Sequence, residues 1–200
     1  YFRPQVWGAR RLEEVLRKRL PPDGPFGESW EISGHPLHVS RVAEGPHRGA
    51  GLDELWARFA ADWTGSLAPP PRFPWLLKFL DCDELLSVQV HPDDAAAARL
   101  LPGESGKTEA WLVLHADPDA QIYAGLLPGV TRADLERHLD AGTVGQCLHA
   151  FRPQPGDFLF LPAGTVHAAG GGLVFLEIQQ SSDATFRLFA WNRLDRKSGV

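Results

Sequence analysis

The chain of 200 residues is 44% hydrophobic and 22% charged, which is the balance of a globular domain with its own core. Its formal net charge of −5 argues against binding to the phosphate backbone of nucleic acids or to an anionic membrane surface, because both require clustered basic side chains. No segment approaches the roughly 20 apolar residues of a membrane-spanning helix, and Cys82 and Cys147 are too far apart for a paired thiolate motif. We therefore expect a cytoplasmic protein without nucleic-acid or membrane partners, with both cysteines in the core.

The amino-terminal part of the chain predicts short strands and two helices. Residues 6–20 indicate the end of a strand followed by a helix, and residues 28–33 and 38–43 indicate short strands. In residues 51–65 the apolar side chains recur at helical spacing and Gly65 follows them. This arrangement is typical of an amphipathic helix that ends at a glycine.

From Phe73 onward the hydrophobic pattern changes to the alternation that is typical of strands. Two helices interrupt it, one at 93–101 before Pro102 and one at 131–139 with Thr131 as its N-cap. Closely spaced strands with few helices between them favour an antiparallel sandwich or a small barrel. We expect Trp63, Trp75 and Trp191 in its core. The predicted strands are 75–81, 85–91, 109–116, 120–126, 157–162, 165–169, 173–180 and 185–192.

The segment SVQVHPDD, residues 87–94, places polar and apolar side chains on opposite faces of one predicted strand. Ser87, Gln89 and His91 share one face, while Val88 and Val90 share the other. Polar side chains on an inward face must be satisfied by each other, by water or by a metal. Taken alone, a Gln-x-His pattern is more often a hydrogen-bonded pair than a metal site.

Two other segments strengthen the metal hypothesis. Glu109 lies in the predicted strand 109–116, and the turn at 162–164 leads to His167. Together with Gln89 and His91 they form a set of nitrogen and oxygen donors that suits zinc, iron or manganese. Because the set contains no thiolate, it is typical of a catalytic site rather than a closed structural one.

Five segments in chain order resemble the type I mannose-6-phosphate isomerases of the short bacterial kind. They are FGESWEIS, SVQVHPDD, GKTEAWLVL, PAGTVHA and EIQQSSDATFRLFAWNR, and the resemblance runs from VWGARRL to WNR, nearly the whole chain. It implies a mainly β fold, a cupin-type double-stranded antiparallel β-barrel or jelly roll with additional helices. It also implies interconversion of mannose 6-phosphate and fructose 6-phosphate through a cis-enediol. One zinc ion per chain would be held by the residues that match the ligand motifs, Gln89, His91, Glu109 and His167.

Four further residues are candidates for the chemistry of a sugar phosphate substrate. The resemblance implies a catalytic role for Arg187, which the sequence alone allows as an ion-pair residue or an anion clamp. Lys107 lies two residues before Glu109, and we expect it either to transfer protons or to bind phosphate. Ser87 and Glu177 are expected substrate contacts, and the identity of the proton carrier stays open between Lys107 and Glu177.

We expect residues 1–200 to form one metal-binding catalytic domain with helical insertions. The resemblance implies a second, smaller barrel after WNR, which we expect to be absent from this chain because it ends at Val200. We expect either a one-barrel variant or part of a longer protein, and the start at Tyr1 without any methionine fits the latter. The alternatives to this activity are a non-catalytic sugar-binding metal protein and an isomerase for another sugar or sugar phosphate; the presence of Lys107 and Arg187 favours an enzyme.

Overall fold

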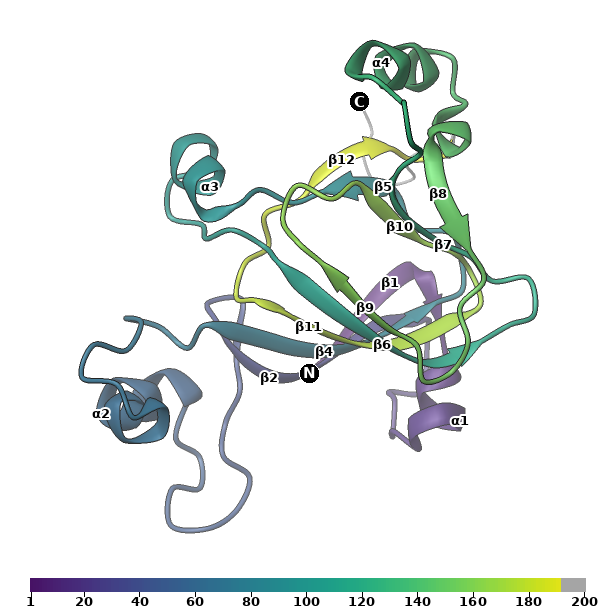
Figure 1. The fold of residues 1–200 in the computed structure, drawn as a ribbon. Helices are drawn as coiled ribbons and strands as arrows, with labels where there is room; N and C mark the ends of the chain where they lie inside the picture. The colour runs from purple at the N-terminus through teal and green to yellow at the C-terminus, as the bar shows by residue number, and fades with distance from the viewer. Residues whose placement is uncertain (192–200) are drawn as a thin grey trace.

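A computed structural model describes residues 1–191, which form two antiparallel sheets that face each other (Figure 1). The larger sheet contains β1 (Phe2–Ala9), β2 (Phe26–His35), β3 (His38–Val39), β4 (Trp75–Cys82), β6 (Glu109–Ala116), β9 (Phe158–Leu161) and β11 (Leu173–Gln180). The smaller sheet contains β5 (Val88–Val90), β7 (Ile122–Leu126), β8 (Leu148–Phe151), β10 (His167–Ala169) and β12 (Phe186–Phe189). Their spatial orders are β1-β2-β4-β11-β6-β9, with β3 paired to β2, and β12-β5-β10-β7-β8.

The main hydrophobic core lies between the two sheets. Leu80, Val113 and Phe175 from the larger sheet pack with Ile122 and Ala169 from the smaller one, and all five are almost fully buried. Each strand contributes alternate residues to this core because successive side chains point to opposite faces of a sheet. The predicted barrel of antiparallel strands is thereby confirmed.

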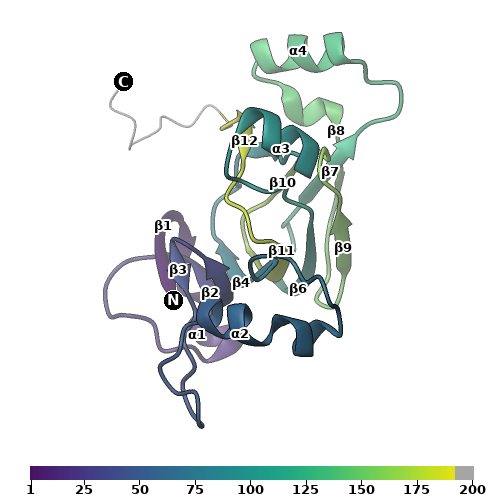
Figure 2. The same ribbon diagram turned by 90° about the vertical axis from the view of Figure 1, so that its left-hand side faces the viewer.

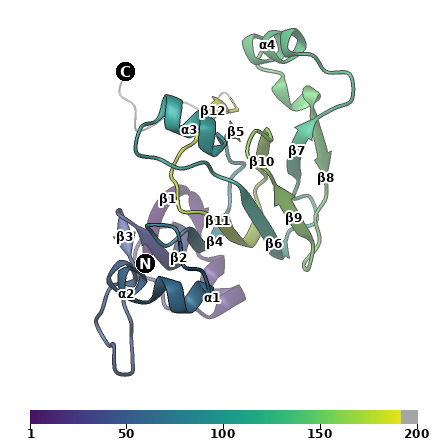
Figure 3. The ribbon, with the colours of Figure 1, turned by 60° about the vertical axis from the view of Figure 1, so that its left-hand side comes forward.

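The helices lie outside this core. They are α1 (Arg11–Leu16), α2 (Leu52–Thr64), α3 (Asp94–Leu100), α4 (Arg132–Asp140) and the short 3-10 helix η1 (Val144–Cys147). In the views of Figure 2 and Figure 3, α4 lies at the end of the molecule opposite to α1 and α2. None of the described helices is long and apolar enough to cross a membrane.

Helix α1 covers part of the outer face of the larger sheet. Its buried Leu12 packs with Val174 of β11 and with Phe79 of β4. The backbone N–H of Arg11 at the start of α1 donates to Oδ2 of Asp81 at 2.7 Å, so a buried carboxylate satisfies one of the free donors at this helix end.

Most predicted elements are present, with shifted ends. The helix in 51–65 is α2, and Gly65 takes the left-handed φ of 65° that ends it. Thr131 caps α4 through a hydrogen bond that its side chain accepts from Asp134 N–H. The predicted strand 85–91 is shorter than expected, since only Val88–Val90 pair, and Ser87 lies before it.

Some predictions were wrong or incomplete. The helix predicted within 6–20 ends at Leu16, because Arg17 adopts a left-handed φ of 54°. Strand β8 was not predicted, since its four residues show too little alternation. Trp63 and Trp75 are 51% and 50% exposed rather than in the core, whereas both cysteines are buried as expected. Residue Asn192 of the predicted strand 185–192, and with it most of the WNR motif, lies outside the described residues.

Candidate metal centre

Strands from both sheets bring three potential ligands together in the interior. His91 follows β5 and His167 begins β10 in the smaller sheet, while Glu109 begins β6 in the larger one. One donor atom from each lies within 4.8 Å of the other two, and the three residues are 1–2% exposed. Within residues 1–191 this is the one such group of histidine, cysteine and carboxylate side chains.

Both imidazoles are oriented by backbone carbonyls. Nδ1 of His91 lies 2.9 Å from the carbonyl oxygen of Ala184, and Nδ1 of His167 lies 2.9 Å from that of Thr165. A carbonyl oxygen only accepts hydrogen bonds, so each Nδ1 carries the hydrogen and each Nε2 keeps its lone pair. This is the usual arrangement of metal-binding histidines, in which an outer partner fixes the ring.

The carboxylate of Glu109 lies between the two imidazoles. Its Oε1 is 3.1 Å from Nε2 of His167, and its Oε2 is 3.5 Å from Nε2 of His91. Both oxygens are buried and neither has a contact of hydrogen-bond geometry among the described residues, although the ammonium of Lys107 lies 3.1 Å from Oε2. Two imidazole lone pairs beside a buried carboxylate form a donor set that fits a divalent cation.

Gln89 supplies the fourth predicted donor. Its backbone pairs with His167 across β5 and β10, which places both side chains on the same face of the smaller sheet. Nε2 of its amide lies 3.3 Å from Nε2 of His167. The amide can present either its nitrogen or its oxygen to this point, since the two ends differ only by rotation about the last bond.

A chain of buried charges extends from Glu109 along the inner face of the larger sheet. Nζ of Lys107 is 3.1 Å from Glu109 and 3.8 Å from Glu177, and Nζ of Lys78 is 3.2 Å from Glu177 and 3.9 Å from Glu28. The guanidinium of Arg3 lies 3.4 Å from Glu28 at the far end of this chain. The three carboxylates therefore face three cationic groups and the cluster is formally balanced.

The protonation states of this cluster suit a metal. Burial opposes the charge on Glu109, but the positive charge of Lys107 holds its pKa well below the usual range. Burial, followed by the positive charge of Lys107, lowers the pKa of His91 to about 3, so its imidazole is neutral at neutral pH. Burial and then repulsion from Glu109 raise the pKa of Glu177. Metal binding requires an ionised carboxylate and neutral imidazoles, the states favoured for Glu109 and His91.

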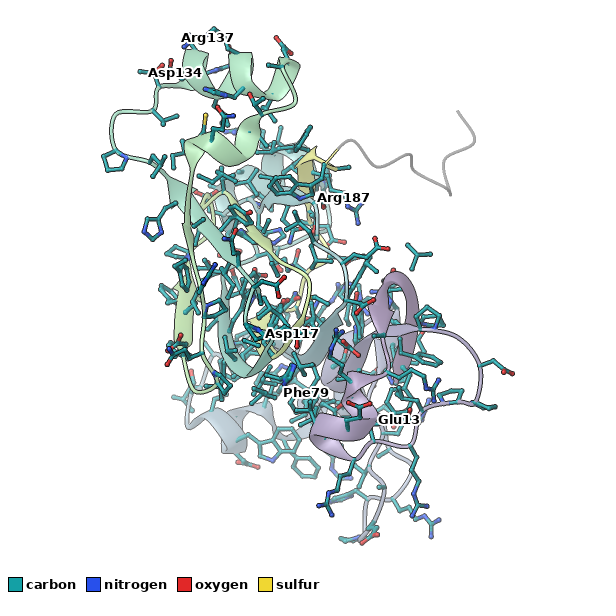
Figure 4. All side chains as sticks on the ribbon, turned by 90° about the vertical axis from the view of Figure 1, so that its right-hand side faces the viewer. Glu13, Phe79, Asp117, Asp134, Arg137 and Arg187 are labelled. Carbon is teal, nitrogen blue, oxygen red and sulfur yellow. The ribbon has the colours of Figure 1, made fainter. Side chains whose placement is uncertain are left out.

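The predicted substrate residues occupy different positions. Lys107 and Glu177 are buried within the cluster, and Nζ of Lys107 also lies 3.2 Å from Nε2 of His91. Arg187, labelled in Figure 4, pairs with Gln89 across β12 and β5 but is exposed. Within residues 1–191 its guanidinium makes no hydrogen bond or ion pair. Ser87 is half-buried and its hydroxyl likewise has no hydrogen bond to a described residue.

Sequence reasoning missed Lys78 and Glu28. Lys78 is 8% exposed although it stands within the apolar strand β4, and the register aligns it with Glu177 on β11. A signal was present, because Lys78 has the same parity as the buried Leu76 and Leu80 and therefore faces inward.

Two facing antiparallel sheets that enclose two histidines and a carboxylate define a cupin-type barrel whose interior offers donors of the kind that bind metals. A comparison with protein families identifies the particular family, since residues 2–109 match the catalytic domain of phosphomannose isomerase type I. The chain therefore belongs to the type I phosphomannose isomerase family.

Individual relatives agree with this assignment. A mannose-6-phosphate isomerase of Streptococcus mutans is 40% identical over 191 residues, which are 96% of this chain and 59% of that protein. The solved mannose 6-phosphate isomerase of Bacillus subtilis superposes with a TM-score of 0.90 at 37% identity, covering 98% of this chain and 61% of the other. A more distant structure, described as mannose 6-phosphate isomerase bound with zinc and yttrium, shares the fold with a TM-score of 0.66 at 18% identity over 94% of this chain and 68% of that one. The chain thus spans about 60% of the length of its curated relatives.

Proposed function

We propose that this protein is a zinc-dependent aldose-ketose isomerase that interconverts mannose 6-phosphate and fructose 6-phosphate. The observation that carries the proposal is the buried group of His91, Glu109 and His167 with Lys107 against it. Two comparisons support the proposal. The chain belongs to the type I phosphomannose isomerase family, and its relatives are named mannose-6-phosphate isomerase. Cytoplasmic location and the lack of nucleic-acid or membrane partners remain predictions.

We assign the metal to Gln89, His91, Glu109 and His167. The three last-named residues converge on one point, and Gln89 lies within reach of it. The nitrogen and oxygen donors suit zinc, although iron and manganese have similar preferences. When bound, a divalent ion would act as a Lewis acid that stabilises negative charge developing on the sugar oxygens.

Lys107 is our candidate for the proton carrier. The reaction removes the hydrogen on C2 as a proton and adds a proton to C1, while the hydroxyl proton moves from O2 to O1. Such a transfer needs a group within hydrogen-bond distance of the reacting carbons that can gain and lose a proton. Nζ of Lys107 faces the centre, with Glu177 as a further partner at 3.8 Å that holds the side chain in place.

Arg187 and Ser87 are assigned to the substrate. Arg187 lies on the same sheet face as Gln89 and has an unpaired guanidinium among the described residues, so it is free to bind phosphate or a developing oxyanion. Ser87, just before β5, would bind a sugar hydroxyl or orient Lys107. Glu177 would contact the substrate through Oε1, the oxygen that also lies near Nζ of Lys78 and Nζ of Lys107.

A single experiment separates an isomerase from a sugar-binding protein. Zinc-loaded protein is incubated with fructose 6-phosphate in D2O and followed by proton NMR. We expect signals of mannose 6-phosphate with deuterium incorporated at C2, because the proton carrier exchanges with solvent. Broadened substrate signals without any product would support a binding protein instead, and a product other than mannose 6-phosphate would indicate a different isomerase.

A further inference from the structure

A buried serine holds the outer partner of His91. The carbonyl oxygen of Ala184 accepts the hydrogen on Nδ1 of His91 at 2.9 Å, and the N–H of Ala184 donates to Oγ of Ser182 at 3.1 Å. Ser182 is 1% exposed and Ala184 is 3% exposed, so bulk water cannot reach these groups and replace the two hydrogen bonds. The N–H and the carbonyl belong to the two peptide units that flank the Ala184 Cα, so the serine hydroxyl holds the residue whose carbonyl orients His91.

The same hydroxyl also reaches the segment that carries Lys107. Oγ of Ser182 donates to the carbonyl oxygen of Ser105 at 2.8 Å, with Oε2 of Glu104 at 3.2 Å as a second acceptor. Ser105 precedes Lys107 by two residues. One hydroxyl thus joins the segment after β11 to the segment before β6, using its single hydrogen on one side and a lone pair on the other.

The backbone of Ser182 is fixed independently of its side chain. Its carbonyl oxygen accepts a hydrogen bond from Nε2 of Gln179 at 2.7 Å, and its N–H donates to the carbonyl of Gln180 at 2.7 Å. Loss of the hydroxyl would leave this backbone in place but would remove the hydrogen-bond partner of Ala184 N–H. An unpaired buried N–H is unfavourable, so we expect Ala184 to shift and to carry with it the adjoining peptide unit whose carbonyl accepts from His91.

We propose that Ser182 is a positioning residue of the metal centre. Its hydroxyl fixes the carbonyl that orients His91 and ties that carbonyl to the Lys107 segment. This proposal rests on the metal centre proposed above. Outer partners of metal-binding histidines typically change metal affinity by roughly 10–100-fold when they are lost, and Ser182 acts one step further out, so the lower end of that range applies.

The chain offers a matched control in the neighbouring serine. The hydroxyl of Ser181 makes no hydrogen bond within residues 1–191, while its backbone N–H donates to Pro74 at 2.9 Å and its carbonyl accepts from Ser105 Oγ at 3.5 Å. Ser181→Ala keeps both backbone contacts. It therefore removes a serine hydroxyl from the same segment but leaves the hydrogen bond between Ala184 N–H and Ser182 Oγ in place.

The experiment measures zinc affinity by competition with a chromophoric chelator, below the melting temperature of each metal-free protein. We expect Ser182→Ala to bind zinc about tenfold more weakly than the wild-type chain and Ser181→Ala to match the wild type. Ser182→Gly, which also lacks the hydroxyl, serves in place of Ser182→Ala if that variant does not fold without zinc. A second readout is the Nδ1–H signal of His91 in NMR, which should persist in Ser181→Ala and shift or exchange away in the Ser182 variant.

The outcomes separate this role from the metal centre itself. If the wild-type chain binds zinc and the Ser182 and Ser181 variants bind it equally, the positioning role is wrong and the metal centre stands. If the wild-type chain does not bind zinc, both proposals fail.

Discussion

Glu109 is the proposed ligand on which the proposed metal centre depends most. Its two buried oxygens face the Nε2 atoms of His167 and His91, and no other described carboxylate comes as close to both rings. Glu109→Gln keeps the shape of the side chain but removes its charge. We expect zinc affinity to fall by more than the roughly 10–100-fold that follows loss of an outer-shell partner.

Chelator competition measures this loss. Glu136→Gln on the exposed face of α4 makes the same change far from the barrel interior and should leave zinc affinity unaltered. A Glu109→Gln protein that retains zinc as tightly as this control would remove Glu109 from the ligand set.

Arg187 should act on the reaction rather than on the metal. Because its guanidinium is exposed on β12, Arg187→Ala should keep zinc bound while kcat falls by roughly 10²–10³, the usual loss for one group that stabilises transition-state charge. Arg187→Lys should recover only part of the rate, since an ammonium cannot bind an oxyanion through two parallel hydrogen bonds. Zinc content and steady-state kinetics are measured together.

The control for Arg187 is the exposed Arg152, beyond β8. Arg152→Ala should leave kcat unaltered. If Arg187→Ala has the same kcat as this control, Arg187 has no part in the chemistry.

The sequence predicts which polar side chains meet in the interior when simple alternation relates them. Gln89 and His91 share a face by simple alternation, and the structure brings both to the same point as Glu109. Lys78 was overlooked because an isolated lysine in an apolar strand has no motif around it. Ser182 has no periodic signal at all, since it acts through backbone groups of an irregular segment.

Among the strands and helices, a β-bulge limits what parity can predict. Counting along β6 from Glu109 assigns His115 to the inner face, but the register with β11 shifts between Val174 and Phe175. His115 then pairs with Val174, which packs under α1, and its Nε2 lies 3.0 Å from Asp117. A bulge depends on the partner strand, so the sequence of β6 alone does not reveal it.

Helix α1 depends on a buried carboxylate from β4. Asp81 is fully buried and accepts a hydrogen bond from the backbone N–H of Arg11. Asp83 instead lies 2.8 Å from the guanidinium of Arg11, and its side chain is 49% exposed. We expect Asp81→Ala to lower the free energy of unfolding by about 1–3 kcal/mol, because it leaves a buried donor unpaired. Asp83→Ala should cost under about 1 kcal/mol, as surface ion pairs do.

Urea denaturation gives both values. Equal losses for the two aspartates would show that the helix start does not depend on Asp81.

The barrel as a whole has a strand order that its sequence does not reveal. Short alternating segments indicate antiparallel sheets, yet β11 lies between β4 and β6, which are both distant from it along the chain. The resemblance to a known family supplied that architecture, and the exposed Trp75 shows that hydrophobicity alone does not decide which face is covered.

Since the proposed ligands come from both sheets, a bound metal should stabilise the entire barrel. Free zinc at 100 times its Kd contributes ~2.7 kcal/mol to a protein that binds it only when folded. For a domain of this size that corresponds to a rise in Tm of about 5–10 °C, which chelation should reverse. Differential scanning calorimetry measures the shift, and Glu109→Gln should show none; a shift of equal size in that variant would mean that zinc binds elsewhere.

The most direct test is a zinc titration of the metal-free chain in which turnover of fructose 6-phosphate to mannose 6-phosphate is measured at each addition. We predict that turnover rises in proportion to bound zinc and levels off at one ion per chain. Turnover that persists in excess chelator, or a chain that holds zinc at this centre and produces no mannose 6-phosphate, would contradict a metal-dependent isomerase.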